Sequence, residues 1–346
     1  MAEILFPGLA GGGGAAMVGS QKEWLMAIDF NGQVAVVTGA GGALGSAFCW
    51  ELARRGAAVV ANDLGGDPTG QGGSTGYADA VVEELRGLGA RAVANYDTVA
   101  TQAGGQAVID AALAAFGRVD IVISNAGNQR NGAFGALSEE DVESVLAVHV
   151  KGAFNICQPA YRAMTEQGYG RIVLVGSQSG VFGNPYRANY GAAKTALIGL
   201  MNVIAQEAPA GIAVNTLFPN AQGGRLGGTP IEQRPDIAFL KAAGARTRHF
   251  IEGMKPEFVA ALACYIASRE CDSSQHMYSV LGGKYSRLFV GLTRGWYSPG
   301  PDAPSCDDIA AHISQIDDRA DYDVPLSGLD EMDTVLAARR ALGLDA

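Results

Sequence analysis

The chain has 346 residues, of which 48% are hydrophobic and 17% are charged, and its formal net charge is −10. This composition indicates a folded globular protein with a large core and excludes an intrinsically disordered chain. The acidic balance and the lack of lysine- or arginine-rich runs argue against nucleic acid or an anionic membrane as a partner. No stretch of about 18 apolar residues occurs, so we expect no membrane span.

The cysteines and histidines are scattered along the chain. The five cysteines fit neither a disulfide framework nor a zinc site, and the four histidines lie far apart in the sequence. We therefore predict reduced, structural thiols, no metal ion and a cytoplasmic location, because disulfides are rare in that compartment.

Composition divides the chain into three parts. Residues 1–29 are rich in glycine and are expected to form a flexible leader, to which we assign no function. Residues 30–297 show a regular alternation of strand-like and helix-like segments and form the predicted main domain, although residues 220–255 interrupt this rhythm. Residues 298–346 begin with several prolines and are predicted to be a helical C-terminal extension.

The alternation in the main domain predicts an α/β fold. Runs such as Val34-Ala-Val-Val37 are apolar throughout, which is typical of a parallel strand buried on both faces. Strands that alternate with helices form right-handed βαβ units, which build a doubly wound Rossmann fold with ligands at the carboxyl ends of a central parallel sheet. The predicted strands are Val34–Thr38, Ala57–Asp63, Ala92–Asp97, Val119–Ser124, Arg171–Gly176, Ile212–Leu217 and Met277–Leu281. The predicted helices are Leu44–Arg55, Tyr77–Leu88, Gln102–Phe116, Glu139–Gln167, Asn189–Ala208, Pro256–Ser268, Asp307–Ile316 and Leu329–Leu342.

A glycine-rich turn, Thr38-Gly-Ala-Gly-Gly-Ala-Leu-Gly45, joins the first predicted strand to the first helix. Glycines permit the tight turn and let backbone N–H groups approach a pyrophosphate at the positive end of the helix. Asp63 ends the next strand, 24 residues after Gly39. A carboxylate there accepts both ribose hydroxyls of NAD and repels the extra phosphate of NADP. Residues 30–297 are therefore predicted to be a dinucleotide-binding domain with NAD as its cofactor.

A second pattern predicts acid–base chemistry. Tyr190 and Lys194 are four residues apart in a predicted helix, so both project from one face. A tyrosine with its usual pKa of about 10 is a poor base, but a nearby ammonium group stabilises the phenolate and lowers that pKa. Tyr190 would exchange a proton with a substrate oxygen, and Ser177, at a preceding strand end, would hydrogen-bond the same oxygen. These residues predict hydride transfer between nicotinamide and an alcohol or ketone carbon.

With these motifs, residues 31–290 resemble the short-chain dehydrogenase/reductase family. The motifs that carry the resemblance are the turn Thr38–Gly45, Asn125-Ala-Gly127, Ser177 and Tyr190-Gly-Ala-Ala-Lys194. The resemblance implies that Tyr190 is the acid–base catalyst and that Ser177 orients the substrate. It also implies that Lys194 binds the nicotinamide ribose and tunes Tyr190.

The turn, the aspartate and the resemblance together define the predicted site. The resemblance implies that Asp97 contacts adenine and that the segment beginning at Asn125 lines the adenosine side. The predicted catalytic residues are Ser177, Tyr190, Lys194 and His149. The predicted cofactor-binding residues are Gly39, Gly41, Ala43, Leu44, Gly45, Asp63, Leu64, Asp97, Thr98, Asn125, Ala126, Gly127, Tyr190, Lys194 and Pro219.

The chain departs from the family pattern at four positions. Ala43 stands in place of a glycine of the turn, Ser124 in place of an asparagine, and Asn220 in place of the glycine that commonly follows the proline. His149 occupies the position of an asparagine that helps to organise a proton-relay water in most members. Two roles stay open for His149: support of that relay through its backbone or imidazole, or packing beside the site.

A narrower resemblance concerns the dehydrogenase unit of the peroxisomal multifunctional enzyme type 2, a (3R)-hydroxyacyl-CoA dehydrogenase also called a 17β-hydroxysteroid dehydrogenase. The segments that carry it are Asn62-Asp-Leu-Gly-Gly-Asp67, Val93-Ala-Asn-Tyr-Asp97, Gly183-Asn184, Ala188-Asn-Tyr190, Pro219-Asn-Ala221 and the tail from Trp296. It favours a 3-hydroxyacyl-CoA, with a steroid-derived acyl group as one option, over a free hydroxysteroid or another secondary alcohol. A non-catalytic NAD(H)-binding scaffold or sensor is disfavoured, because Tyr190 and Lys194 are both present.

Residues 220–255 are expected to cover the substrate as a loop. Six cationic and three acidic side chains give this segment a local charge of +3. Two interpretations are open: arginine contacts with the phosphates of CoA, or a solvated loop whose charges contribute little. The charged residues are Arg225, Arg234, Lys241, Arg246, Arg248 and Lys255 against Glu232, Asp236 and Glu252. The family resemblance also implies a homodimer or homotetramer assembled through the helices Glu139–Gln167 and Asn189–Ala208, with residues 298–346 as an additional contact.

Overall fold

The computed structural model describes residues 28–221, 237–300 and 302–344. Its centre is an eight-stranded sheet in the order β3-β2-β1-β4-β5-β6-β7-β8, in which every strand but β8 is parallel, so the predicted doubly wound α/β fold is confirmed. Nearly all of the expected leader and residues 222–236 of the expected substrate loop lie outside the described residues. The strands of this sheet are β1 (Val34–Thr38), β2 (Ala58–Asn62), β3 (Ala92–Asn95), β4 (Ile121–Ser124), β5 (Gly170–Val175), β6 (Ile212–Asn220), β7 (Met277–Leu281) and β8 (Lys284–Leu288).

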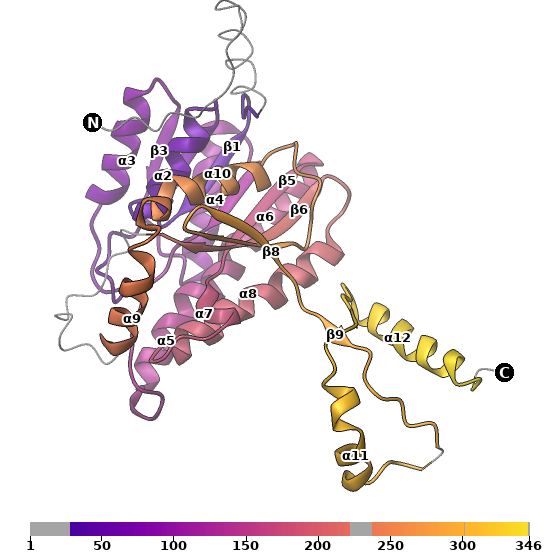
Figure 1. Ribbon diagram of the computed structural model, residues 1–346. Helices are drawn as coiled ribbons and strands as arrows, with labels where there is room; N and C mark the ends of the chain where they lie inside the picture. The colour runs from indigo at the N-terminus through magenta and orange to yellow at the C-terminus, as the bar shows by residue number, and fades with distance from the viewer. Residues whose placement is uncertain (1–27, 222–236, 301, 345–346) are drawn as a thin grey trace, which may run out of the picture.

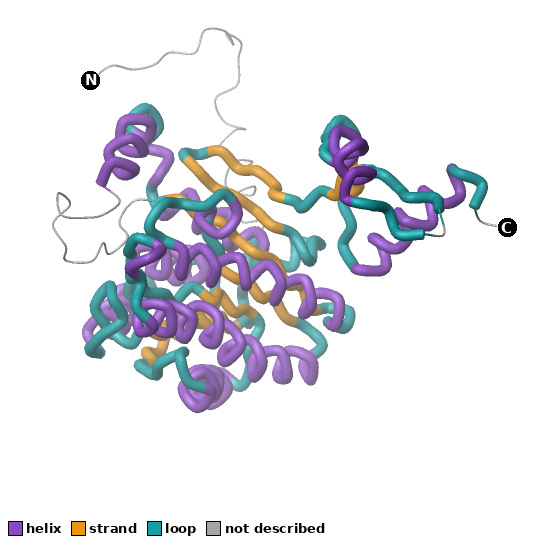
Figure 2. Tube along the Cα trace, turned by 90° about the horizontal axis from the view of Figure 1, so that it is seen from below, coloured by secondary structure: helices purple, strands orange, loops and turns teal. Residues whose placement is uncertain are grey.

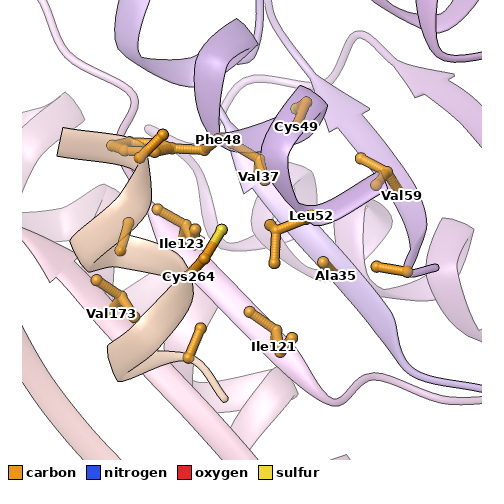
Figure 3. Packing of buried hydrophobic residues seen from close by; sticks show 14 of the residues in the cluster. Ala35, Val37, Phe48, Cys49, Leu52, Val59, Ile121, Ile123, Val173 and Cys264 are labelled. Carbon is orange, nitrogen blue, oxygen red and sulfur yellow. The ribbon is translucent and has the colours of Figure 1, made fainter. Parts of the chain in front are cut away.

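Helices cover both faces of the sheet (Figures 1 and 2). Along β1, Ala35 and Val37 contact a core layer built with α2, α3 and α10, whereas Val34 and Val36 contact the layer built with α4, α6 and α8. Figure 3 shows the first layer, where Leu52 of α2 packs over the strands. The helices are α2 (Ala43–Ala53), α3 (Gly76–Gly87), α4 (Gln102–Phe116), α5 (Glu139–Leu146), α6 (Gly152–Gln167), α7 (Gln178–Val181), α8 (Ala188–Glu207), α9 (Ile237–Thr247), α10 (Pro256–Ile266), α11 (Cys306–Ile316) and α12 (Gly328–Ala341), with short 3-10 turns at Phe134–Ala136 and Ile251–Met254.

The strand order reverses between β1 and β4, and this reversal positions the site. The chain moves from β1 outward to β3 and then returns to the other side of β1 at β4. In a doubly wound sheet the loops on the two sides of such a point diverge, which opens a crevice at the carboxyl ends of the strands. The glycine-rich turn after β1 and the Asn125 segment after β4 meet at this crevice.

The predicted helix Glu139–Gln167 is present over its whole length, but it is not α-helical throughout. The structure divides it into α5, a π-helical turn over Ala147–Lys151, and α6. Over five residues, the spacing of apolar residues in a π turn cannot be distinguished from that in an α-helix. The sequence pattern therefore did not reveal the turn. Single π turns frequently occur at functional sites, and this turn carries the buried His149.

An edge strand was missing from the prediction. β8 pairs with β7 in antiparallel orientation through a hairpin whose two turn residues are Gly282 and Gly283. Their φ angles of +58° and +79° are those of a two-residue hairpin turn that favours glycine at both positions. The Gly-Gly pair between two short strand-like runs was therefore a usable signal for this strand.

The last part of the chain, residues 289–344, forms an arm that extends away from the sheet (Figures 1 and 2). It contains the small β9–β10 sheet (Leu292–Thr293 and Tyr322–Asp323) and helices α11 and α12. The Trp296 and His312 rings stack with centroids 4.0 Å apart, and Arg339 Nη1 donates to Tyr297 Oη at 2.8 Å. Neither α11 nor α12 has a buried residue. Both helices expected in the C-terminal extension are present, while its start at residue 298 stays a prediction.

Two features are absent from the described part of the chain. No helix there combines the length and the apolar character that crossing a bilayer requires. No three His, Cys, Asp or Glu side chains in this part of the chain are grouped as ligands of a metal ion would be.

Candidate active site

A cavity of about 780 Å³ opens at the carboxyl ends of the central strands. All but one of the predicted site residues line it, from Gly39 at the glycine turn to Lys194 on α8. The exception is Gly41, which packs behind the wall, because a Cβ at this position would lie 2.6 Å from Tyr77 Cβ. The structure therefore brings together two sets of residues that are up to 155 positions apart in the sequence, one typical of a dinucleotide site and one of an acid–base site.

The glycine turn leaves backbone donors available at the start of α2. Gly39 has a φ of +66°, and a Cβ there would lie 2.8 Å from Ala126 Cα, so both conformation and space require glycine. Gly42 is the N-cap of α2 and offers no side-chain hydrogen bond, so no side chain caps the first N–H groups of the helix. Such a helix end suits a phosphate. Ala43 begins α2, where a methyl group fits an ordinary helical position.

Asp63 connects the glycine turn to the next loop. Its carboxylate is 7% exposed, and its two oxygens accept hydrogen bonds from Gly41 N at 2.8 Å and Gly65 N at 2.7 Å. In the described part of the lining, the cationic residues are Arg187 and Lys194, which belong to the start of α8. The carboxylate is therefore fixed at the position expected to accept ribose hydroxyls.

Two asparagines outside the set of predicted site residues, Asn62 and Asn95, hold Asp97 in place. Asn62 Nδ2 donates to Asn95 Oδ1 at 2.8 Å and to Asp97 O at 2.9 Å, and Asn95 Nδ2 donates to Asp97 Oδ2 at 2.8 Å. Asn125 Nδ2 donates to Thr38 O at 3.0 Å, which ties the end of β4 to the glycine turn. Asparagine at a strand end that precedes an expected site residue was the signal for these positioning roles.

Lys194 and Ser177 lie beside Tyr190. The Lys194 ammonium is 5.7 Å from the centre of the Tyr190 ring and donates a 2.6 Å hydrogen bond to Val175 O at the end of β5. Burial lowers the pKa of Lys194 to about 7. Ser177 is buried as the N-cap of α7, where its Oγ accepts from Ser179 N at 3.2 Å. The strand end, the short helix and α8 thus place all three side chains on one wall of the cavity.

The pKa of Tyr190 differs from the expectation. Burial raises it above the usual value for tyrosine, and the hydrogen bond with Ser177 and the charge of Arg187 offset only part of that rise. The expected lowering by Lys194 is not found in the chain by itself, because desolvation of the phenolate outweighs the nearby positive charges. Arg187 also lines the cavity and was not among the predicted site residues.

His149 is held edge-on to Tyr190, with ring centroids 5.2 Å apart. Its Nε2 lies 2.8 Å from Asn128 O and 3.2 Å from Asn128 N, while Nδ1 is buried without a hydrogen-bond partner among the described atoms. Burial, and then the charge of Lys194, lower the pKa of His149 to about 3, so the ring is neutral near pH 7. Gly127 makes room for it, because a Cβ there would lie 2.4 Å from the imidazole Cε1.

Only part of the expected substrate loop is described, from Ile237 onward. It contains α9, which the sequence prediction lacked although Ile237-Ala-Phe-Leu-Lys-Ala-Ala has helical apolar spacing. Lys255 pairs with Glu252 at 2.8 Å on the surface. The predicted charged residues Arg225, Glu232, Arg234 and Asp236 lie outside the described residues.

Comparisons with known proteins agree with this geometry. The short chain dehydrogenase family model matches residues 33–225. A Mycobacterium tuberculosis protein assigned to the short-chain type dehydrogenases/reductases is 42% identical over 287 residues, which are 83% of this chain and 94% of that protein. Peroxisomal multifunctional enzyme A of Dictyostelium discoideum is 37% identical over 314 residues, which are 90% of this chain and 66% of that enzyme.

A solved structure shows the same fold. The full-length peroxisomal multifunctional enzyme type 2 of Drosophila melanogaster matches with a TM-score of 0.71 and 29% identity, over 91% of this chain and 51% of that one. The chain thus spans only part of the length of the multifunctional enzymes it resembles. It belongs to the short-chain dehydrogenase/reductase family, whose members are oxidoreductases of CH–OH groups that generally use NAD(H) or NADP(H).

Proposed function

We propose that the chain is an NAD-dependent dehydrogenase of 3-hydroxyacyl-CoA thioesters. The observation that carries the proposal is that Asp63, Tyr190 and Lys194 all line the same cavity. A carboxylate at the end of β2 favours NAD over NADP. The thioester is supported by the sequence segments shared with the dehydrogenase unit of the multifunctional enzyme and by the relatives that carry this name. A hydroxysteroid or another secondary alcohol is the competing substrate.

The residues present fit a nicotinamide dinucleotide. The start of α2 after the glycine turn would hold the pyrophosphate, Asp63 the adenosine ribose, and Lys194 the nicotinamide ribose. Leu64, Asp97 and the segment beginning at Asn125 would enclose the adenosine. When bound, the nicotinamide takes up or gives back the hydride.

The chain's own residues then manage the proton and the orientation of the substrate. Tyr190 takes the hydroxyl proton as the alcohol becomes a ketone and returns it in the reverse direction. Ser177 hydrogen-bonds the same oxygen and fixes the distance to Tyr190. The Lys194 ammonium, anchored to the end of β5, stabilises the phenolate that forms during the reaction.

His149 acts through the proton path rather than as a charged group. A ring with a pKa of about 3 is neutral at pH 7, and Nδ1 is its one nitrogen without a hydrogen-bond partner among the described atoms, which leaves that atom for a proton relay. Since its ring contacts the edge of Tyr190, we assign it the relay role that the family gives to an asparagine.

The test is a side-by-side assay of NAD⁺ and NADP⁺ reduction by the purified chain. We expect the 3-hydroxyacyl-CoA with NAD⁺ to show a kcat/KM at least about tenfold above that of a hydroxysteroid, a ratio that a few substrate contacts can produce. A higher value for the steroid would establish the competing substrate. Binding of NADH without turnover of either compound would support the scaffold alternative instead.

We also propose a homodimer or homotetramer in which the arm contributes to an interface. Helix α12 carries large apolar side chains that are open to water in a single chain, among them Leu329 at 72% exposure and Met332 at 61%. A second copy of the chain is the partner that the family resemblance implies, and self-association would bury this surface. The family resemblance places the main contacts on α5, α6 and α8 and gives the arm an additional one. Sedimentation analysis should therefore show weaker self-association for the Leu329→Asp/Met332→Asp variant than for the unsubstituted chain, and equal association of the two would contradict a contact by the arm.

Three further predictions go with this function. Residues 30–297 act as the catalytic domain, and residues 220–255 act as the substrate loop, with contact to CoA phosphates as one of its two interpretations. The cytoplasmic location stays a prediction, since several relatives carry a peroxisomal name. Imaging of a fluorescent fusion of the full chain would distinguish these compartments.

A further inference from the structure

The loop between β2 and α3 forms one wall of the cavity. We call residues 64–75 the strap. Its first half, with Leu64, Gly66, Asp67, Pro68 and Gly70, lines the cavity beyond Asp63. Asp67 closes the strap on itself, since its Oδ1 accepts from Thr69 N at 2.8 Å and from Gln71 N at 3.0 Å. The tip of the strap is therefore a defined turn and not an extended linker.

The tip of the strap is tied to the segment that follows β4. Pro68 O accepts from Gln129 N at 3.0 Å, and Thr69 O accepts from Arg130 Nε at 3.2 Å and from Asn128 Nδ2 at 3.3 Å. Residues 128–130, after β4, therefore donate to two consecutive carbonyl groups of the strap. The connection borders the cavity, since Pro68, Asn128 and Gln129 are all part of its lining.

Asn128 is at the centre of these contacts. It is 4% exposed, and its amide Nδ2 has three acceptors within reach: Thr69 O at 3.3 Å, Ser144 O at 3.3 Å and Ser144 Oγ at 2.9 Å. Because an amide has two N–H groups, one can bond the strap while the other is shared between the two oxygens of Ser144 on α5, so the side chain links the two elements. Its Oδ1 is buried without a partner among the described atoms, so this side chain is not fully satisfied by its surroundings.

The backbone of the same residue holds His149. Both the N–H and the carbonyl of Asn128 face His149 Nε2, at 3.2 Å and 2.8 Å. Gly127, directly before it, has no side chain to separate the loop from the ring. A shift of Asn128 would therefore move both the hydrogen-bond partner and the packing surface of the imidazole.

We propose that Asn128 is a positioning residue that couples the strap over the adenosine end of the cavity to the orientation of His149. The proposal rests on the role assigned above to His149. A cofactor that presses the strap into one arrangement would fix Asn128 and with it the imidazole beside Tyr190. Since coupling between two sites is reciprocal in binding free energy, a change at the strap should alter both cofactor affinity and turnover.

A matched pair of glycines in the strap provides the test. Gly70 and Gly72 have similar φ angles of +86° and +76°, so alanine strains the backbone about equally at both positions. A Cβ at Gly70 would lie 2.7 Å from Asn128 Nδ2, whereas a Cβ at Gly72 would have no neighbour within 4 Å among the described atoms. Only Gly70→Ala therefore pushes on Asn128.

We expect Gly70→Ala to raise the Kd for NADH and to lower kcat, each by about fivefold, within the range of coupling changes seen for residues between two sites. Gly72→Ala should leave both within about twofold. NADH fluorescence titration and steady-state assays provide these numbers. The coupling is overturned if Gly70→Ala changes the Kd alone, or if Gly72→Ala has the same effect on kcat.

A second pair of measurements tests the route through His149. In a His149→Ala background, Gly70→Ala should still weaken NADH binding but should no longer lower kcat, because the residue through which it acts is gone. A persisting fivefold loss of kcat would overturn the proposal. The same measurements of Kd and kcat on Asn128→Ala, with Ser144→Ala for comparison, repeat the test at the centre of the network. Failure of the proposed function itself would appear separately, as unchanged turnover of Tyr190→Phe.

Discussion

The carboxyl edge of the sheet and the arm differ in which side chains they bury. At the sheet edge, polar groups such as Asp63, Asn95 and Lys194 are buried and hydrogen-bonded within the same chain. In the arm, apolar side chains such as Leu329 and Met332 are exposed. The first arrangement is largely satisfied within one molecule, whereas the residues that the structure describes leave the apolar surface of the second uncovered.

This difference indicates what stabilises each region. Burial of a polar group is tolerated only if its partners are fixed, so the sheet edge has to be rigid, and that rigidity orients the catalytic groups. Exposed apolar area in the arm contributes little to the stability of a single chain, and it can be recovered by contact with another surface. Substitutions in the two regions should therefore affect different properties.

The largest effect is expected from Tyr190→Phe. Loss of the phenol removes the general acid–base group and should lower kcat at least about 100-fold, while NADH binding is retained. Tyr161→Phe is the matched control, because its hydroxyl bonds Glu207 O at 3.0 Å outside the cavity. Steady-state assays and NADH titration give the comparison. Unchanged turnover of Tyr190→Phe would refute its role.

Next in size is a pair of leucine truncations, one in each region. Leu52→Ala removes a fully buried side chain from the core layer of Figure 3 and should lower the free energy of unfolding by about 2–5 kcal/mol. Leu329→Ala in α12 should change it by less than about 0.5 kcal/mol at concentrations where the chain is monomeric. Urea denaturation measures both. A large loss for Leu329→Ala in the monomer would mean that the arm is part of the folded core after all.

The sequence predicted the sheet-edge region better than the rest, for physical reasons. Strands buried on both faces produce unbroken apolar runs, so β1 was predicted with its observed ends. The ends of β7 were also predicted, although its side chains are only partly buried. The glycine turn and the Tyr190–Lys194 pair have fixed spacing, and the structure brings both to one cavity. Such local patterns depend on few neighbours, which is why they can be read from one chain.

Features that depend on contacts between distant segments were not predictable in this way. The strap meets Asn128 across 59 positions of sequence, and no local pattern indicates that pairing. The π turn over Ala147–Lys151 was likewise not indicated by the sequence pattern of this helical segment. The raised pKa of Tyr190 depends on its burial, whereas the spacing to Lys194 alone indicated the opposite direction. Each of these errors arose because the tertiary environment decides the outcome.

A smaller effect is expected for the acid sensitivity of His149. Its pKa is lowered from about 6.5 to about 3 on folding, so below pH 6.5 the unfolded chain binds a proton that the folded chain does not. The stability contributed by the neutral ring is therefore lost as the pH falls, by about 1.4 kcal/mol per unit, or about 2 kcal/mol between pH 6.5 and pH 5. His149→Gln should remove this part of the slope in urea denaturation curves.

His312 in the arm provides the control for that measurement. Its ring stacks on Trp296 and stays partly accessible to water, so His312→Gln is the matched loss of a histidine outside the buried sheet edge. If both variants change the pH dependence of the free energy of unfolding equally, burial of His149 at the sheet edge is not the cause of the effect. The two regions would then not differ in this property.

The smallest effect concerns the choice of cofactor. Asp63→Asn keeps the shape of the side chain but removes its charge and one of the two strong acceptors that now bind Gly41 N and Gly65 N. The ratio of kcat/KM with NAD⁺ to that with NADP⁺ should fall by about tenfold, the effect of weakening one charged hydrogen bond and removing a repulsion. Asp79→Asn makes the same charge change on α3 outside the cavity and should leave the ratio unchanged. A constant ratio in Asp63→Asn would show that this carboxylate serves the turn and the strap alone, and that NAD is selected elsewhere in the cavity.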